Sequence, residues 1–222
     1  MPRKKLTSFC VNLQKQQEDH MSDYIFFMII GYLSGSILYA YIIPKFFCGI
    51  DIRQISKDKN PGTFNAFSCA GIKVGIFVLL LELAKGFLPV FLAARFVSYR
   101  SSLFCLIMAA PVIGHAFPFL HPRQGGKAIA VSFGCLMGLY PFLTPLLYLI
   151  VFYLLFSVII IIEPHLFRSI ITFFCFTVSC IRTLPVRSFI YGSILISATV
   201  VLRHLLRYKK ERLQIRFLPY FR

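Results

Sequence analysis

Residues 51–65 read DIRQISKDKNPGTFN, a polar stretch between two segments rich in aliphatic and aromatic side chains. Its first nine residues carry five charged side chains, those of Asp51, Arg53, Lys57, Asp58 and Lys59. Asn60-Pro61-Gly62 follows, and proline and glycine together interrupt a helix. Backbone N–H groups freed by such a turn, with cations beside them, form a seat for an anion. This first polar island, residues 51–65, therefore predicts an anion-binding loop between two strongly apolar segments.

The composition of the whole chain indicates a membrane protein. Hydrophobic residues make up 58% of its 222 residues and charged residues 14%, and the mean hydropathy is +0.75. A soluble domain carries about 25% charged residues, so this chain has too few polar side chains to cover a water-facing surface. We predict an all-α fold, a polytopic membrane protein with about seven transmembrane helices and short loops that carry the motifs.

Seven apolar segments support this fold class, some near the ~20 residues that a bilayer needs and some shorter. They are Tyr24–Phe47, Ile72–Ala94, Leu103–Pro118, Ile129–Leu143, Leu146–Ile162, Leu166–Ile181 and Phe189–Leu206. We therefore expect a polar N-terminal tail (1–23), a transmembrane domain (24–206) and a basic C-terminal tail (207–222). Met21 stands just before the first apolar segment, so we interpret the upstream residues as an unstructured tail or an over-long reading frame.

The distribution of Lys and Arg predicts the orientation. Fifteen of them lie in residues 45–73, 119–128, 163–169 and 203–222, and eight lie on the other face. Cytoplasmic loops carry the excess of Lys and Arg, so both polar islands and the C-terminus are expected to face the cytoplasm. The net charge of +16 then reflects contact with anionic membrane lipid. No nucleic-acid partner is expected, because no RNA- or DNA-reading motif interrupts the apolar runs. The sequence leaves open whether there is a protein partner.

Two features of the apolar segments predict contacts between them. Small residues at Gly31, Ser34, Gly35 and Ser36 give the first segment a face that can approach another helix closely. Glu82 and Lys85 are three residues apart and share a helix face. They form either a structural ion pair or a pair with a direct role near a substrate, since ionisable groups in a span point at the protein interior.

A second polar island, residues 114–130, reads GHAFPFLHPRQGGKAIA. Gly125 and Gly126 allow the backbone to approach an oxyanion, and Lys127 adds a point charge. The spacing is not that of a nucleotide P-loop, so ATP is not predicted. His115, at the end of an apolar run, is either a satisfied core histidine or a base.

Other chemistry is not indicated. The seven cysteines form no Cys-x-x-Cys pair and lie mostly in apolar runs, so we interpret them as small core residues. No cluster of His, Cys and carboxylates suits a metal, and no cofactor is predicted. Without a nucleophile elbow or a His-x-x-x-x-Asp motif, an enzyme of this sequence would position two substrates rather than form a covalent intermediate.

Several motifs together resemble one family, the bacterial acyl-phosphate:glycerol-3-phosphate acyltransferases, which are seven-span plasma-membrane enzymes. The first motif resembles Gly35-Ser36-Ile37, Gly49-Ile50-Asp51-Ile52-Arg53 and Asn60-x-Gly62-x-x-Asn65. The run LLLELAKGFLPV, residues 79–90, is also similar, with Glu82 where the family typically has Asp. Gly114-His115-x-Phe117-Pro118 followed by GGKAIA, residues 125–130, resembles the second motif. The resemblance covers residues 31–140.

This resemblance implies an activity. The enzyme would move a fatty acyl group from acyl phosphate to the 1-hydroxyl of glycerol 3-phosphate, giving lysophosphatidic acid for phospholipid synthesis in a bacterial plasma membrane. It implicates Asn60, Asn65 and His115 as catalytic residues, and as substrate-binding residues Ser36, Arg53, Gly62, Gly126, Lys127 and Ser169. Arg53 and Lys127 would neutralise phosphate oxygens, and the amides of the Asn60–Asn65 turn would donate to the acyl carbonyl oxygen.

The chain also departs from the family pattern. Lys57-Asp58-Lys59 stands where the family has Gly-Ser-Gly, one extra residue follows Arg53, and Ala128 replaces a Gly. The third motif, Ser-x-x-Ser after an Arg, corresponds at best to Ser169-x-x-Thr172 after Arg168. The His-Arg-x-Asn of the last span is missing, although Arg203-His204 lies nearby.

These departures leave two alternatives open. One is a catalytically weakened paralogue that binds acyl phosphate or glycerol 3-phosphate. The other is a small anion transporter, suggested by polar islands between spans and by Glu82 and Lys85. No inverted repeat is visible, and the charged loops cluster on one face, which argues against transport.

Overall fold

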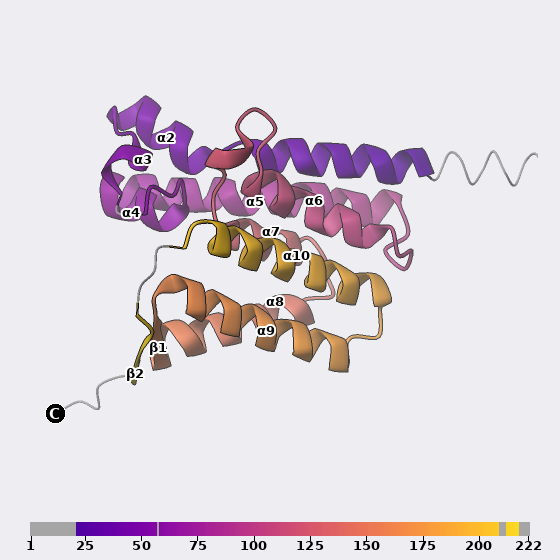
Figure 1. Cartoon of the computed structure of the whole chain (residues 1–222). Helices are drawn as coiled ribbons and strands as arrows, with labels where there is room; N and C mark the ends of the chain where they lie inside the picture. The colour runs from indigo at the N-terminus through magenta and orange to yellow at the C-terminus, as the bar shows by residue number, and fades with distance from the viewer. Residues whose placement is uncertain (1–20, 57, 209–211, 218–222) are drawn as a thin grey trace, which may run out of the picture.

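The structure is a computed structural model that describes residues 21–56, 58–208 and 212–217. Our interpretation of residues 1–20 lies outside the described residues, as does much of the expected C-terminal tail. The described chain forms a bundle of helices that run alongside one another (Figure 1). The expectation of a mainly helical fold is confirmed.

The elements follow one another in this order. A first helix covers residues 21–36. After it come α2 (Tyr39–Cys48), α3 (Ile52–Ile55), α4 (Thr63–Ala70), α5 (Ile72–Phe96), α6 (Phe104–Ala116), the 3₁₀ turn η1 (Pro122–Gln124), α7 (Ile129–Met137), α8 (Thr144–Leu154), the π-helical turn η2 (Leu155–Ile159), β1 (Ile160–Glu163), α9 (His165–Thr183), α10 (Arg187–Leu206) and β2 (Gln214–Phe217).

Among the residues that the structure describes, four helical segments are long and apolar enough to cross a membrane. They are Met21–Cys48, Ile72–Phe96, His165–Thr183 and Arg187–Leu206. Phe104–Ala116 and Thr144–Ile159 are apolar but shorter, and α7 has nine residues. All seven predicted segments therefore contain a helix, while four of the helical segments meet the length of a span.

One part of the fold differs from the all-α expectation. The segment Leu146–Ile162 was expected to be helical throughout, but its last residues form β1, which pairs antiparallel with β2. Ile160-Ile161-Ile162 is a β-branched run, which favours a strand when a partner is available. Pro164 follows and prevents the helix from simply continuing.

The bundle core is apolar and is centred on α6 and its neighbours. The helix α10 packs against both α6 and α9, and α5 packs against α7. Phe104 and Met108 of α6 join one buried cluster with residues of α7, α9 and α10, including Leu136, Phe173 and Ile196. The first helix approaches α6 backbone to backbone, because a Cβ at Gly35 would collide with the main chain of Pro111. The predicted face of small residues is confirmed at this contact.

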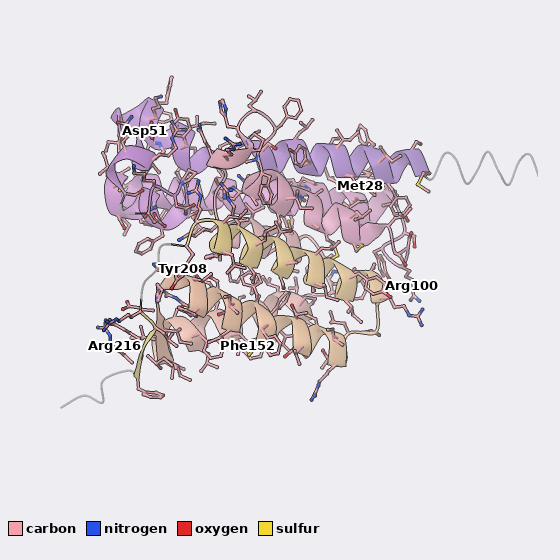
Figure 2. All side chains as sticks on the ribbon, in the orientation of Figure 1. Met28, Asp51, Arg100, Phe152, Tyr208 and Arg216 are labelled. Atoms are coloured by element: carbon pink, nitrogen blue, oxygen red, sulfur yellow. The ribbon has the colours of Figure 1, made fainter. Side chains whose placement is uncertain are left out.

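The polar segments gather at one end of the bundle. Asp51, Tyr208 and Arg216 lie toward one end, and Arg100 lies at the opposite end (Figure 2). The first polar island and the described C-terminal segment therefore share an end, as the charge distribution predicts. That this end faces the cytoplasm stays a prediction.

Candidate active site

Two adjoining cavities open at the polar end of the bundle. Their volumes are ≈ 370 Å³ and ≈ 540 Å³. Six residues line both of them: Asp58, Phe64, Asn65, Lys127, His165 and His204. The smaller cavity also contacts Asn60, Gly62, Glu82, His115 and Arg168, and the larger one Arg207 and Tyr208. Residues from both polar islands thus meet the starts of α7 and α9 and the end of α10.

The turn of the first polar island is closed by an amide. Asn65, on the first turns of α4, donates from Nδ2 to the Asn60 carbonyl oxygen at 2.8 Å and to Asp58 Oδ1 at 2.7 Å. The backbone N–H of Gly62 also donates to the Asn60 carbonyl oxygen, at 2.8 Å. Gly62 is the N-cap residue of α4. The predicted turn is confirmed, and it presents Asn60, Gly62 and Asn65 at the smaller cavity.

Lys127 of the second polar island reaches across to the first. Its Nζ donates to Asp58 Oδ2 at 2.8 Å, in an ion pair whose side chains are 17% and 40% exposed, respectively. Partial burial alone would raise the pKa of Asp58, but the hydrogen bond and charge of Lys127 outweigh burial and hold this pKa below its ordinary value. Asp58 is therefore a carboxylate at neutral pH.

The two glycines before Lys127 are required by packing. A Cβ at Gly125 would collide with the Ala116 carbonyl oxygen, and a Cβ at Gly126 would collide with Nε2 of His115. The Gly126 N–H donates to the His115 carbonyl oxygen at 3.0 Å. In this structure the close backbone approach that the glycines allow is therefore to the end of α6, and it carries Lys127 to the cavities.

His115 belongs to a buried charged cluster with Glu82 and Lys85 of α5. Lys85 Nζ lies 2.8 Å from Glu82 Oε2 and 2.8 Å from His115 Nδ1, and Glu82 Oε2 lies 3.2 Å from His115 Nδ1. Glu82 and Lys85 side chains are each 1% exposed. The predicted ion pair is confirmed. Because Glu82 and His115 also line the smaller cavity, both interpretations of the pair remain compatible with its position.

The same pair also forms hydrogen bonds with the backbone at the break between the first helix and α2. Residues 37–38 are not helical, which leaves main-chain groups without helical partners. Lys85 Nζ donates to the Ile37 carbonyl oxygen at 2.5 Å, and the Ala40 N–H donates to Glu82 Oε1 at 3.3 Å. The ion pair therefore supplies hydrogen-bond partners to two main-chain groups at the helix break.

Arg53 and Ser36 lie in a different place from Lys127. Arg53 donates to both carboxylate oxygens of Asp51, at 3.1 and 3.0 Å, and to Gln124 Oε1 at 2.5 Å. The hydrogen bond of Asp51 raises the pKa of Arg53. Ser36 Oγ donates to the Tyr32 carbonyl oxygen and accepts from the Phe119 N–H. Both residues thus contact the loop of the second polar island, and neither is among the residues that line the two cavities described above.

Ser169 lies behind the cavity wall. Its Oγ is 3.0 Å from His204 Nε2, and His204 Nδ1 is 2.9 Å from the Val200 carbonyl oxygen. Since the carbonyl can only accept, Nδ1 donates to it and Nε2 accepts from the Ser169 hydroxyl. Ser169 therefore orients His204, which lines both cavities.

Several residues at the cavities were not predicted as site residues. These are Asp58, His165, Arg168, His204 and Arg207. A signal existed for three of them. Arg168 is the arginine before the third-motif serine, and His204 and Arg207 keep the three-residue spacing between His and Asn in the His-Arg-x-Asn pattern. Arg207 donates to the Lys59 carbonyl oxygen at 3.2 Å and to Asn60 Oδ1 at 3.4 Å. Partial burial lowers its pKa, and the charge of Asp58 opposes this shift.

Arg203 was noted in the sequence only beside the missing His-Arg-x-Asn pattern and was not predicted to be a site residue. Its buried guanidinium donates from Nη2 to the carbonyl oxygens of Arg123 and Gly125, at 2.8 and 2.7 Å. These bonds fasten the loop of the second polar island to α10. Arg203 is therefore a positioning residue for Gly126 and Lys127.

The family model described as "Glycerol-3-phosphate acyltransferase" matches residues 25–212. A glycerol-3-phosphate acyltransferase of Thermotoga petrophila is 42% identical over 113 residues, which are 51% of this chain and 57% of that protein. One of Maridesulfovibrio salexigens is 38% identical over 131 residues, 59% of this chain and 65% of that protein. The chain thus aligns with less than two thirds of the length of these curated relatives.

Two solved structures are similar over a longer range. The glycerol 3-phosphate form of PlsY (YgiH), an integral membrane glycerol 3-phosphate acyltransferase, gives a TM-score of 0.71 at 26% identity, covering 82% of this chain and 88% of that one. The lysophosphatidic acid form gives 0.69 at 24% identity and supports the fold. The described fold is therefore that of an integral membrane protein of this kind.

Proposed function

The chain belongs to the glycerol-3-phosphate acyltransferase family, and from this premise we propose that it transfers a fatty acyl group from acyl phosphate to the 1-hydroxyl of glycerol 3-phosphate, giving lysophosphatidic acid. One observation supports the proposal most strongly. Side chains from the two motif-bearing islands, Asn60 and Asn65 from one and His115 and Lys127 from the other, line the same cavity.

Lys127 would bind a phosphate group of one substrate. An ammonium at the mouth of a cavity acts as a point charge toward an oxyanion, and Arg168 and Arg207 add positive charge at the same cavities. Positioning two phosphorylated substrates in this way would supply much of the rate enhancement, since no covalent intermediate is required.

The turn of the first polar island would act on the reacting carbonyl. Its oxygen gains negative charge when the hydroxyl of glycerol 3-phosphate attacks, and amide donors aimed at it stabilise that charge. The new bond joins the 1-hydroxyl oxygen to the acyl carbon, and the bond from that carbon to the phosphate oxygen breaks. The departing phosphate would take the hydroxyl proton, which balances the reaction without a protein base.

We place the enzyme in a bacterial plasma membrane with seven spans and with the motif loops and C-terminus in the cytoplasm. The excess of Lys and Arg in those loops supports this orientation. Acyl phosphate, glycerol 3-phosphate and membrane lipid would then meet at the same end of the bundle.

A second candidate is a catalytically weakened paralogue that binds one of the two substrates. The ion pair between Asp58 and Lys127 favours it, because the lysine proposed to bind phosphate already holds a carboxylate.

The test is a reaction of the purified full-length protein in detergent, accompanied by a binding titration in detergent and a flux measurement after reconstitution into vesicles. Palmitoyl phosphate and glycerol 3-phosphate should give lysophosphatidic acid, measured by mass spectrometry, and palmitoyl-CoA as the donor should give none. Substrate binding without product would support the weakened paralogue. Glycerol 3-phosphate flux into vesicles without product would support a transporter and end the proposal.

A further inference from the structure

Asp58 holds three hydrogen-bond donors that face the cavities. Its Oδ2 accepts from Lys127 Nζ at 2.8 Å, and its Oδ1 accepts from Asn65 Nδ2 at 2.7 Å and from the Asn60 N–H at 3.2 Å. The donors come from a lysine, a side-chain amide and a backbone amide. This set, which we call the anion seat, is of the kind that binds a phosphate group.

The carboxylate of Asp58 accepts hydrogen bonds from all three donors of the anion seat, so it takes the place of a bound anion. At a lowered pKa it is ionised at neutral pH and cancels the charge of Lys127. The seat is accordingly complete without any ligand. An incoming phosphate group would meet a carboxylate, and two anions in one seat repel each other.

The Asp58 side chain is also placed so that it can rotate out of the anion seat. Its side chain is 40% exposed, more than that of Lys127 at 17%. It lines both cavities, and it stands in the Lys57-Asp58-Lys59 stretch where the resemblance calls for Gly-Ser-Gly. A rotation of one short side chain would release the three donors while the Asn60–Asn65 turn keeps its own bond.

We propose that Asp58 is an internal competitor for substrate at the anion seat: its carboxylate holds Lys127, which a substrate phosphate uses, together with the two amides assigned above to the acyl carbonyl. Phosphate then binds Lys127 by displacing Asp58. The apparent affinity for phosphate then equals the intrinsic affinity multiplied by the fraction of molecules in which Asp58 has left the seat. The identity of the substrate rests on the proposed function, whereas the competition for the seat does not.

The experiment measures binding without turnover. The purified full-length protein in detergent is titrated calorimetrically with inorganic phosphate and with glycerol 3-phosphate, in the absence of an acyl donor. Asp58→Asn keeps an oxygen that can accept a hydrogen bond but removes the charge. We expect it to bind both ligands about three- to tenfold more tightly, with a gain that shrinks at high salt because exposed charges are screened.

A matched control separates the seat from general electrostatics. Glu163→Gln removes one negative charge from a half-exposed carboxylate that is paired with Arg216 and is not among the residues that line either cavity. It should leave both affinities unchanged. Asp58→Gly, which supplies no side chain at all, should also tighten binding, and melting temperatures report whether each variant is folded.

The outcomes are decisive. Unchanged or weaker phosphate binding in folded Asp58→Asn and Asp58→Gly would overturn the inference and make Asp58 a support for Lys127 and Asn65. Tighter binding in a protein that makes no lysophosphatidic acid would keep the inference and remove the proposed function. Acyl transfer by the parent protein, with unchanged phosphate affinities in the Asp58 variants, would keep the proposed function and remove the inference.

Discussion

Lys127 connects the two polar islands through a single ion pair, and its removal tests the proposed phosphate site. We predict that Lys127→Ala raises the KM for glycerol 3-phosphate about tenfold or more, with a smaller change in kcat. A charge-assisted hydrogen bond contributes about 1.5–3 kcal/mol. Steady-state kinetics with palmitoyl phosphate would measure this. Lys45→Ala is the control, because Lys45 bonds to Tyr41 on the exposed surface. Equal KM values for parent and Lys127→Ala would remove Lys127 from the site.

Ala128 adopts a backbone conformation that favours glycine. Its φ is 60° at the N-cap of α7, where an L-residue costs about 1–2 kcal/mol. Glycine also makes the unfolded chain more flexible, which lowers the stability by about 0.4–1 kcal/mol and offsets part of this gain. We therefore predict that Ala128→Gly stabilises the protein by up to about 1 kcal/mol, seen as a higher melting temperature in detergent. A lower melting temperature would show that the methyl group contributes more than its strain costs.

At the residue scale, the sequence predicted motif residues better than their partners. Asn60, Asn65, His115 and Lys127 were implicated by the resemblance of two motifs to a known family, and the structure brings them to one cavity. The contact between Asp58 and Lys127 joins residues 69 positions apart, and no local pattern encodes such a distance. The bonds of Arg203 to the second polar island span about 80 positions, so they were missed for the same reason.

At the scale of elements, the buried pair of α5 carries the sharpest prediction. Glu82→Gln leaves Lys85 charged and without its carboxylate in a site that is 1% exposed. Removing one partner of a buried ion pair costs about 3–5 kcal/mol, so we expect a large loss of stability in denaturation experiments in detergent.

Two further variants make this result interpretable. Glu163→Gln breaks an exposed pair with Arg216 and should cost about 0–1 kcal/mol. Adding Lys85→Met to Glu82→Gln should recover part of the loss, because the unpaired charge is removed. If Glu82→Gln alone lost no more stability than Glu163→Gln, this result would contradict the assigned role of the pair.

Helices were predictable from apolar runs, but strands were not. Each predicted apolar segment contains a helix because a continuous apolar run in a bilayer must satisfy its backbone internally. The strand β1 looked like the end of such a run. Its partner β2 begins 51 positions after β1 ends, and the family match ends at residue 212, before β2.

At the scale of the whole molecule, the two ends of the bundle should be distinguishable by chemical labelling. Arg216 and Arg100 lie at opposite ends (Figure 2). In a Cys10→Ser/Cys48→Ser/Cys69→Ser background, which also removes the partly buried thiol at the larger cavity, Arg216→Cys should react with a membrane-impermeant thiol reagent only from the cytoplasmic side. Arg100→Cys should react only from the outer side. Inverted and right-side-out vesicles provide the two sides. Labelling of both variants from one side would overturn the predicted topology.

The break between the first helix and α2 has a consequence for biosynthesis. The groups that complete it, on Glu82 and Lys85, are translated more than 40 positions later, since Ala40 and Glu82 are 42 positions apart. In hydrocarbon each backbone group without a partner costs several kcal/mol. A nascent chain that ends at Ala70 should therefore resist alkaline extraction from membranes less well than one that ends at Arg100. We therefore expect the first helix to become stable in the bilayer only after α5 has been translated.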